Sequence, residues 1–129
     1  MSTNYKKELE ETQLSISKLS SHLYDIEDER RRLQKLSTDF DGVNDESFHD
    51  LAYLETLNLP LSSQENIIEV KALFSTYYYS LKNDIDDKLK VLKKEEERVE
   101  EELIYLKKQR YHFQEIENKE RIIGLKEGR

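Results

Sequence analysis

The residue pair whose spacing most suggests chemistry is Glu46-x-x-His49. A Glu and a His three residues apart on a helix can project together into a bundle core, where such pairs hold di-iron or di-manganese centres. A complete centre needs a second copy of the pair and Glu residues from two further helices. No second copy exists, because neither His22 nor His112 has a Glu three residues before it. The sequence therefore favours a surface position for His49 and predicts no metal and no other cofactor.

Serines and paired carboxylates are abundant, but none has the surroundings that catalysis needs. No serine stands in a Gly-flanked turn that could expose a nucleophile. The carboxylate runs Asp86-Asp87 and Glu95-Glu96-Glu97 stand within charged stretches typical of a solvated helix face. The chain also lacks a Gly-rich loop that could hold a phosphate. These patterns predict a protein that is not an enzyme and has no small-molecule substrate.

The distribution of charge argues against direct binding of nucleic acid. The 129 residues include 21 Lys and Arg against 28 Asp and Glu, for a net charge of −7. Residues 1–40 contain 7 basic and 8 acidic residues, residues 63–129 contain 14 and 15, and residues 41–62 contain 5 acidic residues and no basic one. Direct binding would favour a basic stripe. The clusters Arg30–Arg32 and Lys107–Arg110 are flanked by acids, so we expect contact with nucleic acid only indirectly, through a larger complex.

Targeting signals are not evident in the sequence. It contains no cysteine and no run of about 18 apolar residues, the length that a membrane span requires. Its first residues lack the apolar core of a secretory signal. The lack of cysteine fits a reducing compartment. We therefore expect an intracellular protein, cytoplasmic or nuclear, with no membrane contact.

The composition of the chain and the spacing of its apolar residues are typical of long helices, and these helices must position the side chains named above. Charged residues make up 38% of the chain, against about a quarter in globular proteins, and it has 3 Gly and 1 Pro, too few for the turns of a sheet fold. The first segment, residues 1–40, has a heptad seam spaced four and three residues apart. Its eleven members are Tyr5, Leu9, Thr12, Ile16, Leu19, Leu23, Ile26, Arg30, Leu33, Ser37 and Phe40.

The rest of the chain predicts a connector and a second long helix. We expect the first helix to stop at Asp41-Gly42 and residues 41–62 to form an acidic connector with a short helix, which Pro60 ends. Residues 63–129 then form a very long helix with a frayed tail after Gly124. Its apolar stripe contains a step of four and four residues, a stutter, at Leu81, Ile85 and Leu89. The predicted fold is all-α, an elongated coiled-coil helical hairpin.

This hairpin predicts an overhang that needs a partner. If the chain folds back at the connector, Tyr5 lies near residue 98, and the third segment has nothing of its own chain to pack on beyond that point. The apolar stripe nevertheless continues there. We therefore expect partner contacts at Val99, Leu103, Leu106, Phe113 and Ile116.

Polar residues in the seam favour a partner that is a different chain. Arg30 stands at a core position, where a charge lowers stability and often fixes register or partner choice. In a parallel homodimer Arg30 would face its own copy, whereas another protein could place an acid opposite it. Alternatively, the long side chain extends out of the seam to water.

Two further features leave alternatives open. The run Tyr77-Tyr78-Tyr79 spans too much of a helix to face one seam. Tyr77 and Tyr79 can meet a partner at a three-way junction, or one or two of the tyrosines pack under the 44–58 helix with Tyr78 in the core. That acidic, partly apolar connector can likewise dock into a basic groove of another protein or fold back on its own hairpin.

The function predicted from these features is non-catalytic. We expect a coiled-coil scaffold subunit of a larger heteromeric assembly, whose partners are other helical proteins. Kinetochore, tethering and transcription-regulator complexes contain subunits of this build, which is an analogy of architecture alone. The alternative is a self-sufficient homodimeric coiled-coil adaptor. A third class, a metal-dependent helical-bundle enzyme, depends on Glu46 and His49 alone.

Overall fold

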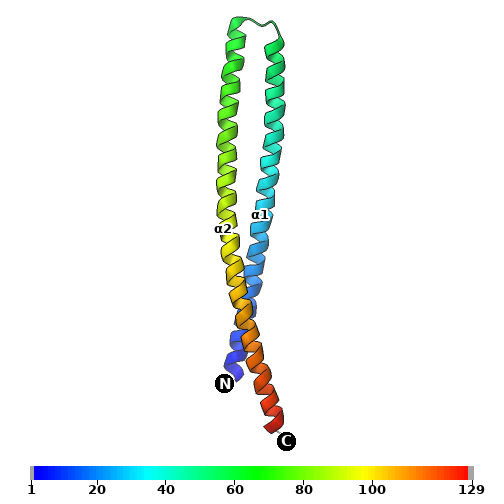
Figure 1. Cartoon of the computed structure of the whole chain (residues 1–129), viewed down its shortest axis with the longest axis vertical. Helices are drawn as coiled ribbons and strands as arrows, with labels where there is room; N and C mark the ends of the chain where they lie inside the picture. Colours follow the sequence, from blue (N-terminus) through cyan, green and yellow to red (C-terminus); the bar gives the residue numbers. More distant parts are fainter. Residues whose placement is uncertain (1, 128–129) are drawn as a thin grey trace. The chain divides into compact units, whose positions relative to one another are not determined.

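The protein is a helical hairpin of two long helices. The computed structural model describes residues 2–127, with the side chains of residues 5–125. Helix α1 runs Ser2–Thr56 and helix α2 runs Leu61–Glu127, and within the described range residues 57–60 are the segment that joins them (Figure 1). Residues 2–127 contain no strand. The prediction of an all-α hairpin is confirmed.

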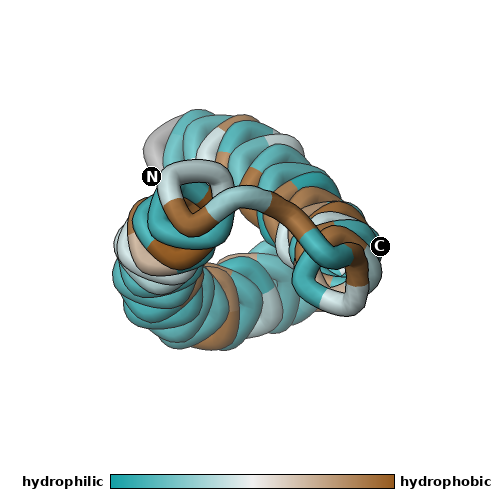
Figure 2. The backbone as a smooth tube through the Cα atoms, turned by 90° about the horizontal axis from the view of Figure 1, so that it is seen from above, coloured by the Kyte–Doolittle hydropathy of each residue, from teal (hydrophilic) through white to brown (hydrophobic). Residues whose placement is uncertain are grey.

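The hairpin divides into two compact units, in each of which a stretch of α1 packs against a stretch of α2. The first unit combines Met1–Asp28 with Lys93–Arg129, and the second is Glu29–Leu92. Hydrophobic bands recur between hydrophilic ones along both helices (Figure 2). Among the described side chains the buried apolar ones are few, and they are Ile16, Ile26, Val99 and Leu103 in the first unit and Ile67, Ile85 and Leu92 in the second.

The heptad seam of α1 lies where its spacing predicts. All eleven side chains from Tyr5 to Phe40 in the predicted seam are buried or half-buried. The predicted stop at Asp41-Gly42 is wrong, because α1 continues to Thr56. A Gly inside a helix costs only about 1 kcal/mol relative to Ala, and contact with α2 continues, since Asn44, Ser47 and Leu51 remain half-buried at heptad spacing. Residues 41–62 are therefore not a separate connector with its own short helix.

The chain reverses at residues 57–60, at one end of the predicted connector, and the predicted helix break at Pro60 is confirmed. The carbonyl of Pro60 accepts hydrogen bonds from the backbone N–H groups of Ser63 at 3.0 Å and Gln64 at 3.1 Å, which gives the first turn of α2 its acceptors. The side-chain amide of Gln64 donates to the carbonyl of Leu59 at 2.9 Å. Proline has no N–H and disfavours helix at the residue before it, so the chain reverses here.

Helix α2 differs from the prediction in two places. It passes through Gly124 to Glu127 rather than fraying there, and residues 128–129 of the expected tail lie outside the described residues. The predicted stutter at Leu81 is also wrong. Leu81 is 41% exposed, whereas its neighbour Lys82 is half-buried in the seam. The seam of α2 around these residues is thus more polar than the apolar pattern predicts.

The register of the hairpin follows from the position of the turn. The chain reverses at residues 57–60 rather than across a connector of twenty-two residues (41–62). Each residue of the first helix therefore faces a later residue of the second helix than the sequence predicts. The ring of Tyr5 lies against that of Phe113, with centroids 6.2 Å apart. We expected Tyr5 near residue 98, so the shift is about four helical turns. Residues 99–116 therefore pair with α1, and the predicted overhang does not exist over these residues.

Candidate functional site

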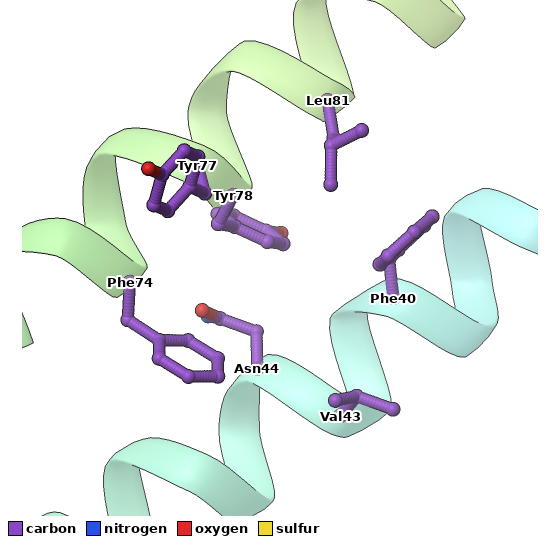
Figure 3. A pocket seen from close by; sticks show the side chains of 7 residues that line it. All are labelled: Phe40, Val43, Asn44, Phe74, Tyr77, Tyr78 and Leu81. Carbon is purple, nitrogen blue, oxygen red and sulfur yellow. The ribbon is translucent and has the colours of Figure 1, made fainter.

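The second unit contains an apolar hollow between its two helices, open to solvent. Its volume is about 240 Å³. We call it the aromatic groove. Its walls come from three residues of α1 and four of α2, and they are Phe40, Val43, Asn44, Phe74, Tyr77, Tyr78 and Leu81 (Figure 3).

Helical periodicity places these side chains together. Phe74, Tyr78 and Leu81 recur at three- and four-residue spacing and so share one face of α2. Phe40 approaches from α1 opposite Leu81 (Figure 3). Phe74 is 38% exposed and Tyr77 65% exposed, so a large part of this apolar surface remains in contact with water. The groove is a row of apolar side chains that the hairpin gathers but does not cover.

Asn44 is the polar member of the groove wall. Its amide lies among apolar side chains beside Phe74 and Tyr78 (Figure 3). The Oδ1 atom is buried and has no hydrogen-bond partner among the described residues. A buried acceptor without a donor costs about 1–3 kcal/mol. The groove thus contains an acceptor that its own hairpin leaves unsatisfied.

Tyr78 is fixed at the groove by polar residues on its other side. Its hydroxyl donates a hydrogen bond to the Asp41 carboxylate, and Lys82 donates to the hydroxyl of Ser37 and forms an ion pair with Asp41 at 3.0 Å. The hydrogen bond to Asp41 raises the pKa of Tyr78 to about 12. The bond from Tyr78, together with that from Lys82, holds the pKa of Asp41 below its ordinary value. These contacts join α1 to α2 and hold the Tyr78 ring in the groove wall.

The groove lies within the acidic part of the chain. Residues 39–81 contain eight acidic residues and a single Lys, so their net charge of −7 equals that of the whole protein. Outside this range twenty basic residues balance twenty acidic ones. Within it, Lys71 pairs with Glu55 at 2.7 Å. The exposed carboxylates nearest in sequence to the groove residue Asn44 are Asp45, Glu46 and Asp39, and Asp50 follows six residues after it.

The first unit has a polar network of its own. The Nε2 atom of His22 on α1 lies 3.2 Å from the Glu95 carboxylate on α2. Arg98 contacts the same carboxylate at 2.6 Å and Glu102 at 3.2 Å. The hydrogen bonds from Arg98 and His22 lower the pKa of Glu95 to about 2. Because these groups are exposed, the network orders a surface of the hairpin and encloses no site.

The expected partner contacts of the third segment lie inside the hairpin. Val99 is 0% exposed and Leu103 7% exposed, both covered by their own chain. Leu106, Phe113 and Ile116 are half-buried. The overhang that suggested partner contacts at these five residues is therefore wrong, and their apolar stripe belongs to the seam.

The remaining predicted contact residues have different surroundings. Arg30 is half-buried in the seam and interacts with another group of the chain. Tyr78 is half-buried, while Tyr77 and Tyr79 are each 65% exposed. The Tyr79 ring lies edge-on to that of Tyr78 at 5.4 Å. Tyr77 and Tyr79 thus remain accessible.

Sequence reasoning missed four members of the groove, namely Val43, Asn44, Phe74 and Leu81. Hydrophobicity favours Leu81 for the seam, whereas the seam holds Lys82, and one heptad earlier it holds Ser75 rather than Phe74. The acidic excess of residues 41–62 was a partial signal, because two of the groove residues, Val43 and Asn44, lie in that segment.

The metal-centre hypothesis depends on the surroundings of Glu46 and His49. In residues 2–127 no group of three or more metal-binding side chains lies together. Glu46 and His49 are both exposed on α1. Within the same range neither helix contains a stretch long and apolar enough to cross a membrane.

Comparisons with protein-family models, with curated proteins and with solved structures gave no match to the chain.

Proposed function

We propose that the protein is a non-catalytic scaffold subunit, whose hairpin binds helices of other chains in a larger assembly. The observation that supports this most is that far more large apolar side chains are exposed than are buried. Among residues 5–125, seven apolar side chains are buried, whereas twenty-two large apolar side chains are exposed. Two helices enclose one seam, and further helices are the usual means of covering the remaining apolar faces.

The second unit supplies the largest share of this exposed surface. Besides the groove residues, its exposed apolar side chains include Leu61, Ile68, Leu73 and Tyr79. Full burial of such a side chain contributes about 1.5–3 kcal/mol. Association costs about 4–15 kcal/mol, so the groove alone is insufficient and the proposed interface must extend along the neighbouring helix faces. A partner helix that covers both the groove and the neighbouring helix faces would bury enough apolar surface to offset the cost of association.

Charge favours a different chain as this partner. A symmetric dimer brings the same surface of both copies together. With the whole net charge of −7 in residues 39–81, such pairing through the groove would oppose two acidic surfaces. The alternative, a homodimeric adaptor, is favoured by the first unit. It exposes Leu14, Ile104 and Ile122, and its 13 basic and 16 acidic residues give a net charge of −3, which is less acidic than the −7 of residues 39–81.

The proposal is tested by photocrosslinking in the cells that make the protein. A benzoylphenylalanine replaces Tyr77 in one variant and Tyr24 in another, because both positions are exposed and they lie on different units. We expect Tyr77 to crosslink to one or a few other proteins, identified by mass spectrometry. Crosslinks only between copies of the chain would favour the homodimeric adaptor. An absence of any protein crosslink at Tyr77 would refute the scaffold function at this surface.

A further inference from the structure

We propose that the aromatic groove binds a basic amphipathic helix of another protein, one with apolar side chains on one face and Lys or Arg beside them. This inference rests on the proposed scaffold function and names the chemistry of its partner. It draws on the shape of the groove, the charge around it and the unsatisfied acceptor in its wall.

The groove suits a protruding side chain of a helix. Its volume of about 240 Å³ is below the range of about 300–1,000 Å³ typical of small-molecule pockets. It lies between two antiparallel helices, where an apolar helix face can insert anchors three, four and seven residues apart. Phe74, Tyr77 and Leu81 are already arranged along this direction on α2. A third helix laid over them would complete a three-helix bundle.

Charge complementarity selects a basic helix over a neutral or acidic one. Asp45, Glu46 and Asp50 are exposed on α1, one, two and six residues after the groove residue Asn44. None of these three carboxylates is among the ion pairs formed by Lys71 and Lys82. Lysines and arginines on the flanks of a bound helix would meet them at the rim, where complementary charge speeds association and fixes orientation.

Asn44 adds a specific polar contact. Its buried Oδ1 atom lacks a donor among the described residues. An N–H or O–H donor on the bound helix would satisfy it once the amide turns toward the groove. An unsatisfied acceptor in an apolar wall lowers the stability of the free hairpin and becomes favourable only in a complex.

The test measures binding of two designed peptides to the full chain by fluorescence anisotropy. Both are about 18 residues long, roughly five helical turns, with Leu on one face and a fluorophore at one end. One has Lys on the remaining positions and the other has Glu. We expect the Lys peptide to bind and the Glu peptide not to bind. Raising the salt from about 0.01 M to about 0.1 M shortens the screening length from about 30 Å to about 10 Å and should weaken binding.

Matched variants locate the site. Asp45→Asn, Glu46→Gln and Asp50→Asn together remove three charges beside the groove, and Glu97→Gln, Glu100→Gln and Glu101→Gln remove three exposed charges from the first unit. We expect the first triple variant to weaken binding of the Lys peptide about tenfold or more, as for lost complementary charges, and the second to change it little. Equal effects of both variants would mean non-specific attraction to an acidic protein and would overturn the proposal.

A second pair of variants tests the apolar contact. Leu81→Ser alters the groove and Ile104→Ser alters the first unit, and the two side chains are 41% and 57% exposed. Circular dichroism confirms that both remain helical. Loss of binding in Leu81→Ser alone supports the groove, whereas unchanged binding in Leu81→Ser overturns it.

The outcomes also separate this inference from the scaffold function. If neither peptide binds while Tyr77 still crosslinks to another protein, the partner has a different chemistry and the inference fails alone. If light scattering shows a dimer that Leu81→Ser dissociates, a second copy occupies the groove and the inference is overturned. If the Lys peptide binds but Tyr77 finds no protein in cells, the scaffold function fails.

Discussion

Truncation of Val99 is the most direct test of the register of the hairpin. Val99 on α2 is 0% exposed and is covered by its own chain. Val99→Ala removes two methyl groups, at about 0.8 kcal/mol each for lost burial. A cavity term adds to this cost, while the higher helix propensity of Ala returns up to about 0.7 kcal/mol. We expect a net loss of about 1–2.5 kcal/mol of unfolding free energy.

Val91→Ala is the matched control. Val91 lies on the same helix, and its side chain is 65% exposed. The same atoms are removed and the same propensity is gained, so the expected change is near zero or slightly stabilising. Urea unfolding followed by circular dichroism measures both. With a slope of about 1–3 kcal/mol per molar urea, Val99→Ala should lower the midpoint by roughly 1 M.

The refuting result is equally clear. If Val99→Ala and Val91→Ala unfold at the same urea concentration, Val99 is not buried in the free chain. The pairing of Tyr5 with Phe113 would then be wrong, and the overhang expected from the sequence would be restored.

Three further predictions follow from the geometry of single groups. Gly42→Ala should raise the unfolding free energy by about 0.4–1 kcal/mol, because Gly42 is helical with no positive φ and an added Cβ meets nothing within 4 Å. Thermal unfolding should show a higher Tm for this variant, and a lower Tm would contradict the prediction. The bond from Tyr78 to Asp41 raises the pKa of Tyr78 from 10.0 to about 12, so it stabilises the hairpin below pH 10 and this contribution is lost as the pH rises toward 12. Absorbance titration of the protein should show a late-titrating tyrosine that the Tyr78→Phe variant lacks, and identical titrations of the two proteins would contradict this. The pKa of Glu95 is lowered from 4.5 to about 2, so this carboxylate contributes stability above pH 4.5 that is lost as the pH falls toward 2. The difference in Tm between the protein and the Glu95→Gln variant should therefore shrink over this pH range. A constant difference would refute the role of the carboxylate.

The periodicity of α1 was predictable because one interaction dominates it. A strict spacing of four and three residues over Tyr5 to Phe40 needs only that one face of the helix turn away from water, and every one of these positions is buried or half-buried. What the pattern could not supply was the end of the helix. A single Gly at residue 42 has a cost of about 1 kcal/mol, which continued packing on α2 outweighs.

The candidate site was harder to predict because it depends on the register. Hydrophobicity places Leu81 in the seam and Lys82 outside it, and the structure has the reverse. Lys82 meets Asp41 and Ser37 across the hairpin, and these partners are known only once the turn at Pro60 is placed. The same error in the turn moved Val99 from the seam to an overhang. Local patterns thus determined the helices, whereas a single loop determined which residues meet.

That loop has a consequence for how the length of such a chain can change. Residues 57–60 set the pairing of α1 and α2, and each later pair is counted outward from them. An insertion of seven residues in one helix would keep its apolar face but would displace every pair farther from the turn, including His22 with Glu95 and Tyr5 with Phe113. An equal insertion at the matching point of the other helix would restore them. Related chains of different length should therefore differ by paired heptads, so that the two helices lengthen or shorten together.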